Sequence, residues 1–585
     1  MWRNAHPHAL VCSHVKRLAA LGPAFVLLLL LAGLSLAGPA SAHEERPATF
    51  PDGTGHVPTY KGLHNPRHRV VCRPDSGRRI KRMSPGPLKR RNTALLRECR
   101  FRSIQAAVDS IERRGTSVYL LPGVYRERRT ARMAKSDYCA NLRTESKDPL
   151  DVTSYIGSLA TESSAAAEEG ESGTGPVALS YADQLRCPHN LNLIALFGDS
   201  TPDDDSIHCD SALCGTQVVG TGRRPGQVRI DNEFAKLNAL RADRVSGLYL
   251  RNFLVQQAEF NAVYVMETDG FVVDRLVTRA NDEYGILAFA SDHGVVKNSE
   301  AYFNGDSGIY PGSASDVNGT STEFEAKRYS ITIHGNDSHH NMVGYSGTAG
   351  NSVHAYDNDF HHNIGGMTTD SLFPGHPGLP QDHARWNDNR IYSNNENYYE
   401  DYVQSGVCAK PIAERGYLDG TVCPVIPVPV GTGVLIAGGN YNSVDHNWMW
   451  DNWRQGGMQL WVPAVLRDEY DPAKLYDTSN HNHWFGNRMG IAPDGTVAHN
   501  GIDFWWDDQG TGNCWEDNVS SHGTVLDNFL LDPPGCDAGG SQFLPGAAVK
   551  DSGFLSCTQY NRDDPVWRDP PGCEWFDTPP EPSES

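Results

Sequence analysis

The stretch that decides the fold runs from Asn281 to Asn363 and repeats one short pattern. Asn281-Asp-Glu-Tyr-Gly285-Ile-Leu-Ala-Phe289 is followed by Asn304-Gly-Asp-Ser-Gly308-Ile-Tyr-Pro-Gly312. In each copy an Asn stands four residues before a Gly that opens a short apolar strand, and the two Gly are 23 residues apart. Asn341 and Asn363 continue the series. A fixed period of about 20 to 50 residues indicates a stacked repeat architecture.

The residues between these marks indicate strands. Gly270-Phe-Val-Val-Asp-Arg-Leu-Val277 alternates, is rich in β-branched residues and has no helical stripe. A repeat of this length holds about three such strands, which predicts an all-β, right-handed parallel β-helix with coils about 4.8 Å apart. An inward Asn in a turn can satisfy backbone groups of the coils above and below. We therefore expect the four repeated Asn to stack as an internal ladder.

The first 42 residues are typical of a secretory signal peptide. Basic residues precede the apolar run 25–31, and Ala40-Ser-Ala42 offers a cleavage site. A membrane anchor is the alternative, but the apolar run is short and is followed by Gly-Pro. Cleavage would leave 48 basic against 71 acidic residues, a net charge of −23, which argues against nucleic acid as a partner. We expect a secreted, extracellular monomer that does not contact membranes after cleavage.

Twelve cysteines remain after residue 42, and an even count in an exported chain favours disulfides over metal sites. Proximity along the chain suggests four pairs: Cys408–Cys423, Cys209–Cys214, Cys557–Cys573 and Cys514–Cys536.

Residues 43–100 form a basic arm, for which we consider two interpretations. It binds acidic polymers or the anionic cell envelope, or it is a solvated and partly disordered leader, which its Pro, Gly and Ser content favours. The β-helix is expected over residues 101–530, interrupted by a surface insertion at Thr144–Asp183. Residues 531–585 read as a disulfide-clipped C-terminal cap with an acidic tail.

The start of the predicted β-helix carries a family resemblance. Residues 101–111 place Ile104, Ala107, Val108 and Ile111 on one helical face, and Val118-Tyr-Leu-Leu-Pro-Gly-Val-Tyr-Arg-Glu127 follows as two strands around a Pro-Gly turn. This opening resembles the pectin-lyase-like superfamily, in which an N-terminal helix caps the coil stack. With the repeats, the resemblance covers roughly residues 101–530, and the chain is most similar to exported bacterial β-helix repeat proteins.

The resemblance implies a polysaccharide enzyme: a lyase, hydrolase, esterase or epimerase. The combined Gly-His-Gly and Arg-Ile-Lys signature of polygalacturonases is missing, as is the paired Arg pattern of well-known pectate lyases. Trp505-Trp-Asp-Asp508 and Gln381-Asp-His383 match no motif of the superfamily that we can assign.

Strand alternation predicts which side chains face outward. We place Ile286, Ile309, Met367, Met458 and Ile502 at the first inward position of their strands. The second inward position is taken by Ala288, Pro311, Thr369, Leu460 and Phe504. The outward set then includes Tyr310, Gln459, Asp370, Trp461, Asp503 and Trp505. Four of these, Asp370, Trp461, Asp503 and Trp505, would lie on one outer strip.

We expect four insertions to follow the same strand: Ser313–Arg328, Ser371–Arg385, Val403–Thr432 and Val462–Asn480. This predicts a groove walled by long loops on one face. Trp461, Trp505, Tyr310 and Gln459 are the predicted substrate-binding residues, because flat rings with polar edges suit sugars. Asp370, Asp503, Asp382 and His383 are the predicted catalytic residues. For each ring the alternative is packing under the loops, and for each Asp or His an ordinary exposed turn.

His339-His340 and His361-His362 occupy nearly the same position in two repeats. A metal site is one interpretation, but neighbouring residues should point apart, so we favour a stacked surface ladder and assign no metal ligand. Asp203-Asp-Asp205 could hold calcium, although an acidic loop is the simpler reading.

Two functions therefore stay open: an exported enzyme acting on a polysaccharide in the groove, and a non-catalytic glycan-binding or cell-envelope protein on the same scaffold.

Overall fold

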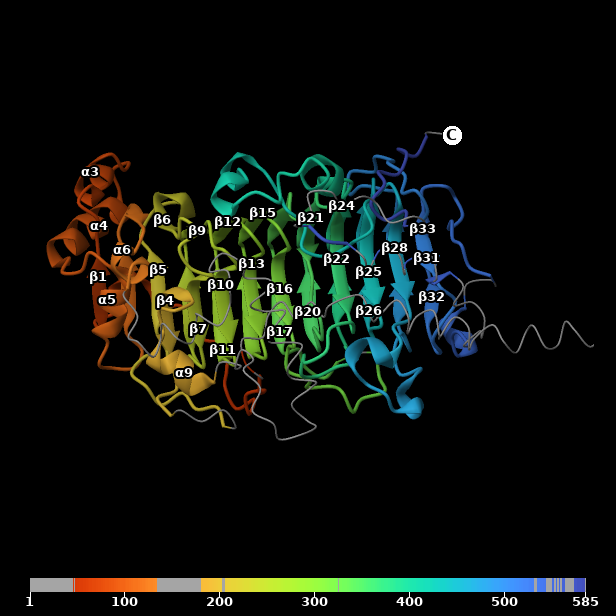
Figure 1. Ribbon diagram of the computed structural model, residues 1–585, viewed down its shortest axis with the longest axis horizontal. Coiled ribbons are helices and arrows are strands. Elements are labelled where there is room, and N and C mark those ends of the chain that lie inside the picture. Colours follow the sequence, from red (N-terminus) through yellow and green to blue (C-terminus); the bar gives the residue numbers. More distant parts are fainter. Residues whose placement is uncertain are drawn as a thin grey trace, which may run out of the picture.

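The chain folds as a right-handed parallel β-helix whose three sheets run the length of the molecule (Figure 1). The structure is a computed structural model and describes residues 46, 48–133, 180–201, 206–324, 326–530 and 534–542, with shorter stretches between 550 and 583. The predicted signal peptide, nearly all of the Thr144–Asp183 insertion and the Asp203-Asp-Asp205 run lie outside the described residues.

Within the described residues, sheet A contains twelve strands, in the order β1 (His68–Val71), β2 (Ser117–Leu120), β5 (Gln217–Gly220), β8 (Leu248–Arg251), β11 (Asp269–Asp274), β14 (Asp292–Lys297), β17 (Ile331–His334), β20 (Val353–Tyr356), β23 (Arg385–Asn387), β26 (Ser443–Asp445), β29 (His483–Phe485) and β32 (Cys514–Glu516). The eleven described strands of sheet B are β3 (Gly123–Tyr125), β6 (Val228–Asp231), β9 (Leu254–Gln256), β12 (Val277–Asn281), β15 (Glu300–Asn304), β18 (Asp337–His339), β21 (Asp359–His361), β24 (Arg390–Tyr392), β27 (Trp448–Trp450), β30 (Arg488–Met489) and β33 (Val519–Ser520). The ten described strands of sheet C are β4 (Asn192–Phe197), β7 (Asn238–Asp243), β10 (Asn261–Met266), β13 (Tyr284–Phe289), β16 (Ser307–Gly312), β19 (Val343–Tyr345), β22 (Gly365–Asp370), β25 (Thr432–Ala437), β28 (Gln455–Leu460) and β31 (Phe504–Trp506).

Each coil passes from sheet C to sheet A to sheet B, so the chain turns at three corners, which we call C–A, A–B and B–C. Neighbouring coils pair in parallel and in register, as Ile286 with Ile309 and Leu287 with Tyr310. The interior is a continuous apolar core that includes Ile286, Ile309 and Met367, as the alternation predicted. Toward the C-terminal end the core takes in larger rings, among them the buried Trp386 and Trp484.

Buried Asn ladders line all three corners. The predicted B–C ladder is confirmed: Asn281 donates its amide to the Asn304 side-chain oxygen at 2.8 Å, and Asn304 donates to Asn341 at 2.7 Å. The same ladder continues from Asn363 through Asn394, Asn452 and Asn500. A second ladder at the A–B corner joins Asn336, Asn358, Asn389, Asn447, Asn487 and Asn518. A third, at the C–A corner, joins Gln381, Asn442, Asn482 and Asn513.

Much of the segment predicted as a partly disordered leader is folded. It contains β1, α3 (Ser76–Lys81) and α4 (Pro87–Glu98), and β1 pairs with β2 at the end of sheet A. A disulfide between Cys72 and Cys99, which the sequence reading did not pair, closes this region. The basic residues made this segment look disordered in the sequence. They lie on the exposed faces of these helices, while Ile80 and Leu95 are buried.

The predicted helix near residue 101 is α5 (Ile104–Asp109), with Ser103 accepting from the Ala106 amide at its N-terminus. Ile104, Ala107 and Val108 reach the main core and the helix packs against β1, β2 and β4. Two further short helices, α6 (Arg128–Ala131) and α9 (Tyr181–Arg186), lie at the same end of the molecule (Figure 1).

All four predicted cysteine pairs form disulfides: Cys209–Cys214, Cys408–Cys423, Cys514–Cys536 and Cys557–Cys573. With Cys72–Cys99, they fit a protein from an oxidising compartment. Among the described residues, no helix is both long and apolar enough to span a membrane.

Breaking one rung of the B–C ladder should destabilise the fold. Asn341→Ala removes an amide that donates to the Ala301 carbonyl and an oxygen that accepts from the Asn304 backbone amide. Leaving buried polar groups unpaired costs about 1–3 kcal/mol each, so we expect the free energy of unfolding to fall by about 2–4 kcal/mol. Urea unfolding measures this loss.

Asn387→Ala is the matched control, because the Asn387 side chain is partly exposed and hydrogen-bonds only with the side chains of His354 and Asp388. The free energy of unfolding of this variant should fall by less than about 1 kcal/mol. Equal losses in the two variants would contradict a structural role for the ladder.

Candidate functional site

The outer face of sheet C, where we predicted the groove, is covered. On β10 to β16, Tyr264, Leu287, Phe289 and Tyr310 form a buried cluster against which Phe50 packs. On β25 and β28, Leu435, Ala437 and Met458 form another, packed with Leu372, Trp505, Phe554 and Trp575. Residues near both ends of the chain therefore pack over this face, and the described residues of these two clusters leave no open platform for a polymer.

The four insertions do not share one corner. Three follow strands of sheet C, at the C–A corner: 313–328 after β16, 371–385 after β22 and 462–480 after β28. The segment 403–432 instead lies between β24 and β25, at the B–C corner, so it borders the opposite edge of sheet C (Figure 1). The prediction that all four lie on one edge was wrong.

The predicted outer strip is correct on β22 and at Trp505 of β31, but the phase is wrong on β28. Met458 and Leu460, which we predicted to face inward, face outward beside Leu435 and Ala437. Phe504 pairs with Gly457 and Trp506 with Gln459, so Gln459 and Trp506 face the core. Gln459 is buried and accepts from the Trp484 indole at 2.9 Å. The prediction of Gln459 as an outward sugar contact was therefore wrong. Trp505 does face outward, but it packs on Phe554.

The other residues of the predicted strip are buried under loops. Trp461 is 8% exposed, donates its indole N–H to the Leu475 carbonyl and stacks on Tyr476. Asp503 lies just before β31 and accepts from the Leu526 amide. Tyr310 and Asp370 do come together: the Thr348 amide donates to Tyr310, and the Thr348 hydroxyl donates to Asp370 at 2.9 Å.

Two other predicted residues, Asp382 and His383, belong to a different site at the C–A corner. Asp316, from the 313–328 insertion, hydrogen-bonds with Asp382, which lies three residues before β23. The His383 Nδ1 atom is 3.2 Å from an Asp382 oxygen. His383 has a φ of +53° and stacks on Tyr441, which stacks in turn on His481. We call Asp316, Asp382 and His383 the corner triad.

In the corner triad, an exposed carboxyl group lies next to buried polar atoms that lack hydrogen bonds. The Asp316 residue is exposed and the Asp382 side chain is 13% exposed, whereas His383 is 1% exposed. Neither ring nitrogen of His383 has a hydrogen bond of acceptable geometry, and one Asp382 oxygen also lacks one. Buried polar groups left in this state are rare and call for an explanation such as a ligand or a catalytic role.

A shared proton links the two carboxyl groups. Desolvation and the neighbouring Asp382 carboxylate raise the pKa of Asp316 to about 6. Because Asp316 is exposed as a residue, we give the Asp382 charge the greater weight. Below about pH 6 the Asp316 carboxyl therefore holds a proton and donates it to Asp382, so the pair carries one negative charge.

The outer face of sheet A beside the triad is open and rich in rings. Its outward side chains from β20 to β29 include His354, Tyr356, Arg385, His483 and Phe485, all partly exposed. Tyr329 lies against His354 with ring centroids 4.6 Å apart, and Arg385 pairs with Asp445 at 3.0 Å. Arg385 opens β23 two residues after His383, so this face begins at the triad.

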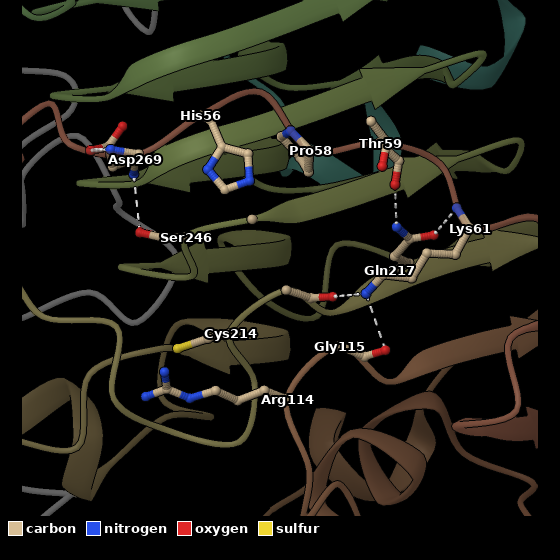
Figure 2. Close-up of a pocket in the computed structure, with 13 residues that line it drawn as sticks. His56, Pro58, Thr59, Lys61, Arg114, Gly115, Cys214, Gln217, Ser246 and Asp269 are labelled. Atoms are coloured by element: carbon tan, nitrogen blue, oxygen red, sulfur yellow. Dashed lines mark hydrogen bonds between the residues drawn. The ribbon is translucent and has the colours of Figure 1, made fainter.

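Two other polar features are weaker candidates. Asp507 hydrogen-bonds with Asp551, and burial raises the pKa of Asp507 to about 7, but Asp507 is fully buried and also bonds the Trp461 amide. A hollow of about 440 Å³ lies beneath residues 55–61 (Figure 2). Its Lys61 ammonium already donates to the Gly115 and Gly215 carbonyls, and its Asp269 accepts from the Gly55 amide.

Metal-ligating groups rarely converge in the part of the chain that the structure describes. One set of three potential ligand atoms lies within 4.8 Å of one another: His483, Cys514 and Cys536. The two cysteines are already joined as a disulfide, so this set does not bind a metal in the oxidised protein. A calcium requirement stays a prediction, because Asp203-Asp-Asp205 lies outside the described residues.

No protein family and no curated protein matches the chain. Among solved structures, the pectate lyase Pel9A aligns at 12% identity over 80% of this chain and 80% of that chain, with a TM-score of 0.31. The A-module of the Azotobacter vinelandii mannuronan C-5 epimerase AlgE6 aligns at 14% identity over 72% and 94% of the two chains, with a TM-score of 0.29. DFA-IIIase from Arthrobacter chlorophenolicus A6 aligns at 9% identity over 79% and 87%, with a TM-score of 0.24. These likenesses concern the fold, and no residue or activity is transferred from them.

Asp370 makes the stability of the protein depend on pH. Its carboxyl is 7% exposed, and desolvation raises its pKa from 3.8 to about 6. A carboxyl with a raised pKa stabilises the fold while protonated, so its contribution is lost as pH rises from about 4 to 6. The shift corresponds to about 3 kcal/mol. We expect Asp370→Asn to reduce the fall in unfolding free energy over this range by about that amount, measured by urea unfolding at each pH.

Asp359→Asn serves as the control, because Asp359 is partly exposed and paired with Arg390 on sheet B. In this variant the free energy of unfolding should fall between about pH 4 and pH 6 as it does in the wild type. An unchanged slope in Asp370→Asn would mean that Asp370 stays ionised in the folded protein.

Proposed function

We propose that the protein is an exported enzyme that transfers protons on a uronic-acid polysaccharide, as a lyase or an epimerase, with the corner triad as its active site. The observation that carries this proposal is the buried His383 imidazole, whose ring nitrogens lack hydrogen bonds beside a proton-sharing carboxyl pair. A base and an acid placed together are what proton abstraction and return require. The disulfides support export.

The separation of the two carboxyl groups argues against hydrolysis by this pair. Glycosidases hold their two carboxyl groups about 5–5.5 Å apart when they retain configuration and about 6.5–9.5 Å apart when they invert it. Asp316 and Asp382 hydrogen-bond with each other, so neither a nucleophile nor a water on the far side of a sugar fits this arrangement. Proton abstraction needs no such gap.

Each member of the triad has a distinct role in the proposal. His383, held by stacking on Tyr441, is the base that removes the proton next to the sugar carboxylate. Asp316 is the acid, which protonates the leaving oxygen in a lyase or the opposite face of the carbanion in an epimerase. Asp382 accepts a hydrogen bond from Asp316 and holds that proton in place.

Sheet A supplies the surface for the polymer. Sugar rings can lie over Tyr356 and Phe485, while Arg385 and His354 offer polar contacts at the strand that leads to the triad. The reaction requires an acidic carbon–hydrogen bond, which uronic acids have next to their carboxylate, so uronate polymers are the substrate class.

A glycan-binding protein without turnover is the second candidate. Arg385 favours it, because its guanidinium is already paired with Asp445 and is not free to stabilise the charge that develops on an enolate-like intermediate. A binder would use the same face of sheet A but would not need the triad.

Incubation with uronate polymers in deuterated water tests the reaction. We expect either unsaturated ends, seen by ultraviolet absorbance, or deuterium at the ring carbon, seen by NMR. Asp316→Asn and His383→Gln should each lower turnover by about 10²–10⁴-fold, because each removes a proton-transfer group. Asp359→Asn, on sheet B, is the matched control and should keep wild-type turnover.

New reducing ends without unsaturation or deuterium would instead indicate a hydrolase. Binding without any product, equally strong in the triad variants, would favour the glycan-binding alternative. Melting temperatures of all variants check that the fold is retained.

The pH profile tests the role of Asp316. With Asp316 as the acid, kcat should fall as pH rises above about 6, because the carboxyl then loses its proton. In Asp316→Asn the residual activity should lack this fall. A wild-type kcat that rises steadily through pH 6 would assign Asp316 a different role.

A further inference from the structure

Four histidines meet at the B–C corner in an arrangement that stacking alone does not require. His339 and His361 end β18 and β21 and pair in register, and His340 and His362 follow them. The rings of His339 and His361 stack at 5.2 Å, and those of His340 and His362 at 5.3 Å. The predicted ladder is therefore confirmed, and we call these residues the histidine quartet.

The two imidazoles on each coil also face each other, which we did not expect. The Nδ1 atoms of His339 and His340 are 2.8 Å apart, and those of His361 and His362 are 2.7 Å apart. His340 and His362 have φ values of +53° and +51°, and this left-handed turn brings the second ring back toward the first. The expectation that adjacent residues point apart fails because it assumed extended backbone.

The spacing of each pair matches two neighbouring ligands of a metal ion. Metal–nitrogen bonds are about 2.0–2.1 Å long, so two nitrogens at a right angle around one ion are about 2.9 Å apart. Tetrahedral coordination would place the two nitrogens about 3.4 Å apart. Right-angle coordination by imidazoles is typical of Cu²⁺ and Ni²⁺.

Carboxylates on the far side of the rings orient them for this role. The His361 Nε2 atom is 3.0 Å from Asp337, and the His339 Nε2 atom is 3.5 Å from Glu300. A ring that donates from Nε2 to a carboxylate keeps its Nδ1 free of a proton, as a ligand must be. His362 then holds the proton of the Nδ1 pair and must move it to Nε2 when an ion binds.

The surroundings leave the quartet accessible. The side chains of His339 and His361 are 18% and 16% exposed. Tyr302 and Tyr392 stack on the two ends of the quartet and limit its movement along the axis.

We propose that the histidine quartet binds one Cu²⁺ or Ni²⁺ ion per chain. One coil supplies two Nδ1 ligands at the spacing already present, and the rings of the other coil, stacked about 5 Å away, rotate to complete the site or leave it to water. A second ion at that distance would be strongly repelled, so we expect a single ion. The site lies on sheet B and is independent of the proposed enzymatic function.

Equilibrium dialysis of the untagged protein against CuCl₂ or NiCl₂ alone, with metal analysis, tests the proposal. We expect one ion per chain. The double variant His340→Asn/His362→Asn should weaken binding at least 10-fold, because Asn keeps the left-handed turn while removing two ligands.

The matched control is His446→Asn/His481→Asn, which removes two other histidines with positive φ. It should bind the ion like the wild type. Electron paramagnetic resonance of the Cu²⁺-loaded wild type provides a readout that needs no variant, and we expect splitting from at least two nitrogen ligands. Absence of stoichiometric binding, oxygen ligands only, or equal losses in both double variants would overturn the proposal.

Discussion

The stacking of identical turns depends on the buried Asn ladders. At each corner the backbone leaves the sheet, and its amides and carbonyls would be buried without partners. An inward Asn satisfies them twice: the Asn358 side chain accepts from the Asn336 backbone amide and donates to the Ile333 carbonyl, both on the preceding coil. Because every coil must present such a residue at the same position, all coils share one register.

The same register produces the surface features of the molecule. Side chains at equal positions on successive coils stack at about the strand spacing. On sheet B this gives a continuous series of rings from Tyr302 to Trp450, in which Tyr392 and Trp450 stack at 4.3 Å. Ring faces in such a series cover one another, so it stabilises the coils and leaves only ring edges for ligands. The face of sheet A that we propose to bind polymer is one where polar residues interrupt such a series.

Both proposed sites lie at corners, where the chain can depart from the repeat. His383, His340 and His362 all follow a strand or precede one with a left-handed φ, which turns a side chain out of the alternation. The corner triad also needs an insertion, since Asp316 reaches Asp382 from a loop of a different coil. Rigid strands on either side hold both groups.

The sequence was sufficient for the fold but only partly for the site. The Asn period predicted the coil, the ladder and the inward residues through Met367, since each follows from local spacing. The phase failed at Gly457 because we aligned that Gly with Gly366; the ladder residue is Asn452, and the Gly four residues after it is Gly456. Asn394 could likewise have shown that the following insertion lies at the B–C corner.

Asp382 and His383 were identified as chemically interesting, but their partner Asp316 was not. Asp316 lies in an insertion, outside the period, and its contact with Asp382 joins two loops that no spacing rule relates. Coverage of sheet C by segments from both ends of the chain was equally hidden, because packing between such distant segments leaves no local pattern.

A crystal structure with a bound uronate oligosaccharide tests most directly the claim that the working surface is sheet A and the C–A corner. The account predicts sugar rings over the outer face of β20 to β29, with one ring within hydrogen-bond distance of His383 or Asp382. An oligosaccharide bound along the outer face of sheet C, displacing the segments that cover Tyr310 and Met458, would contradict it.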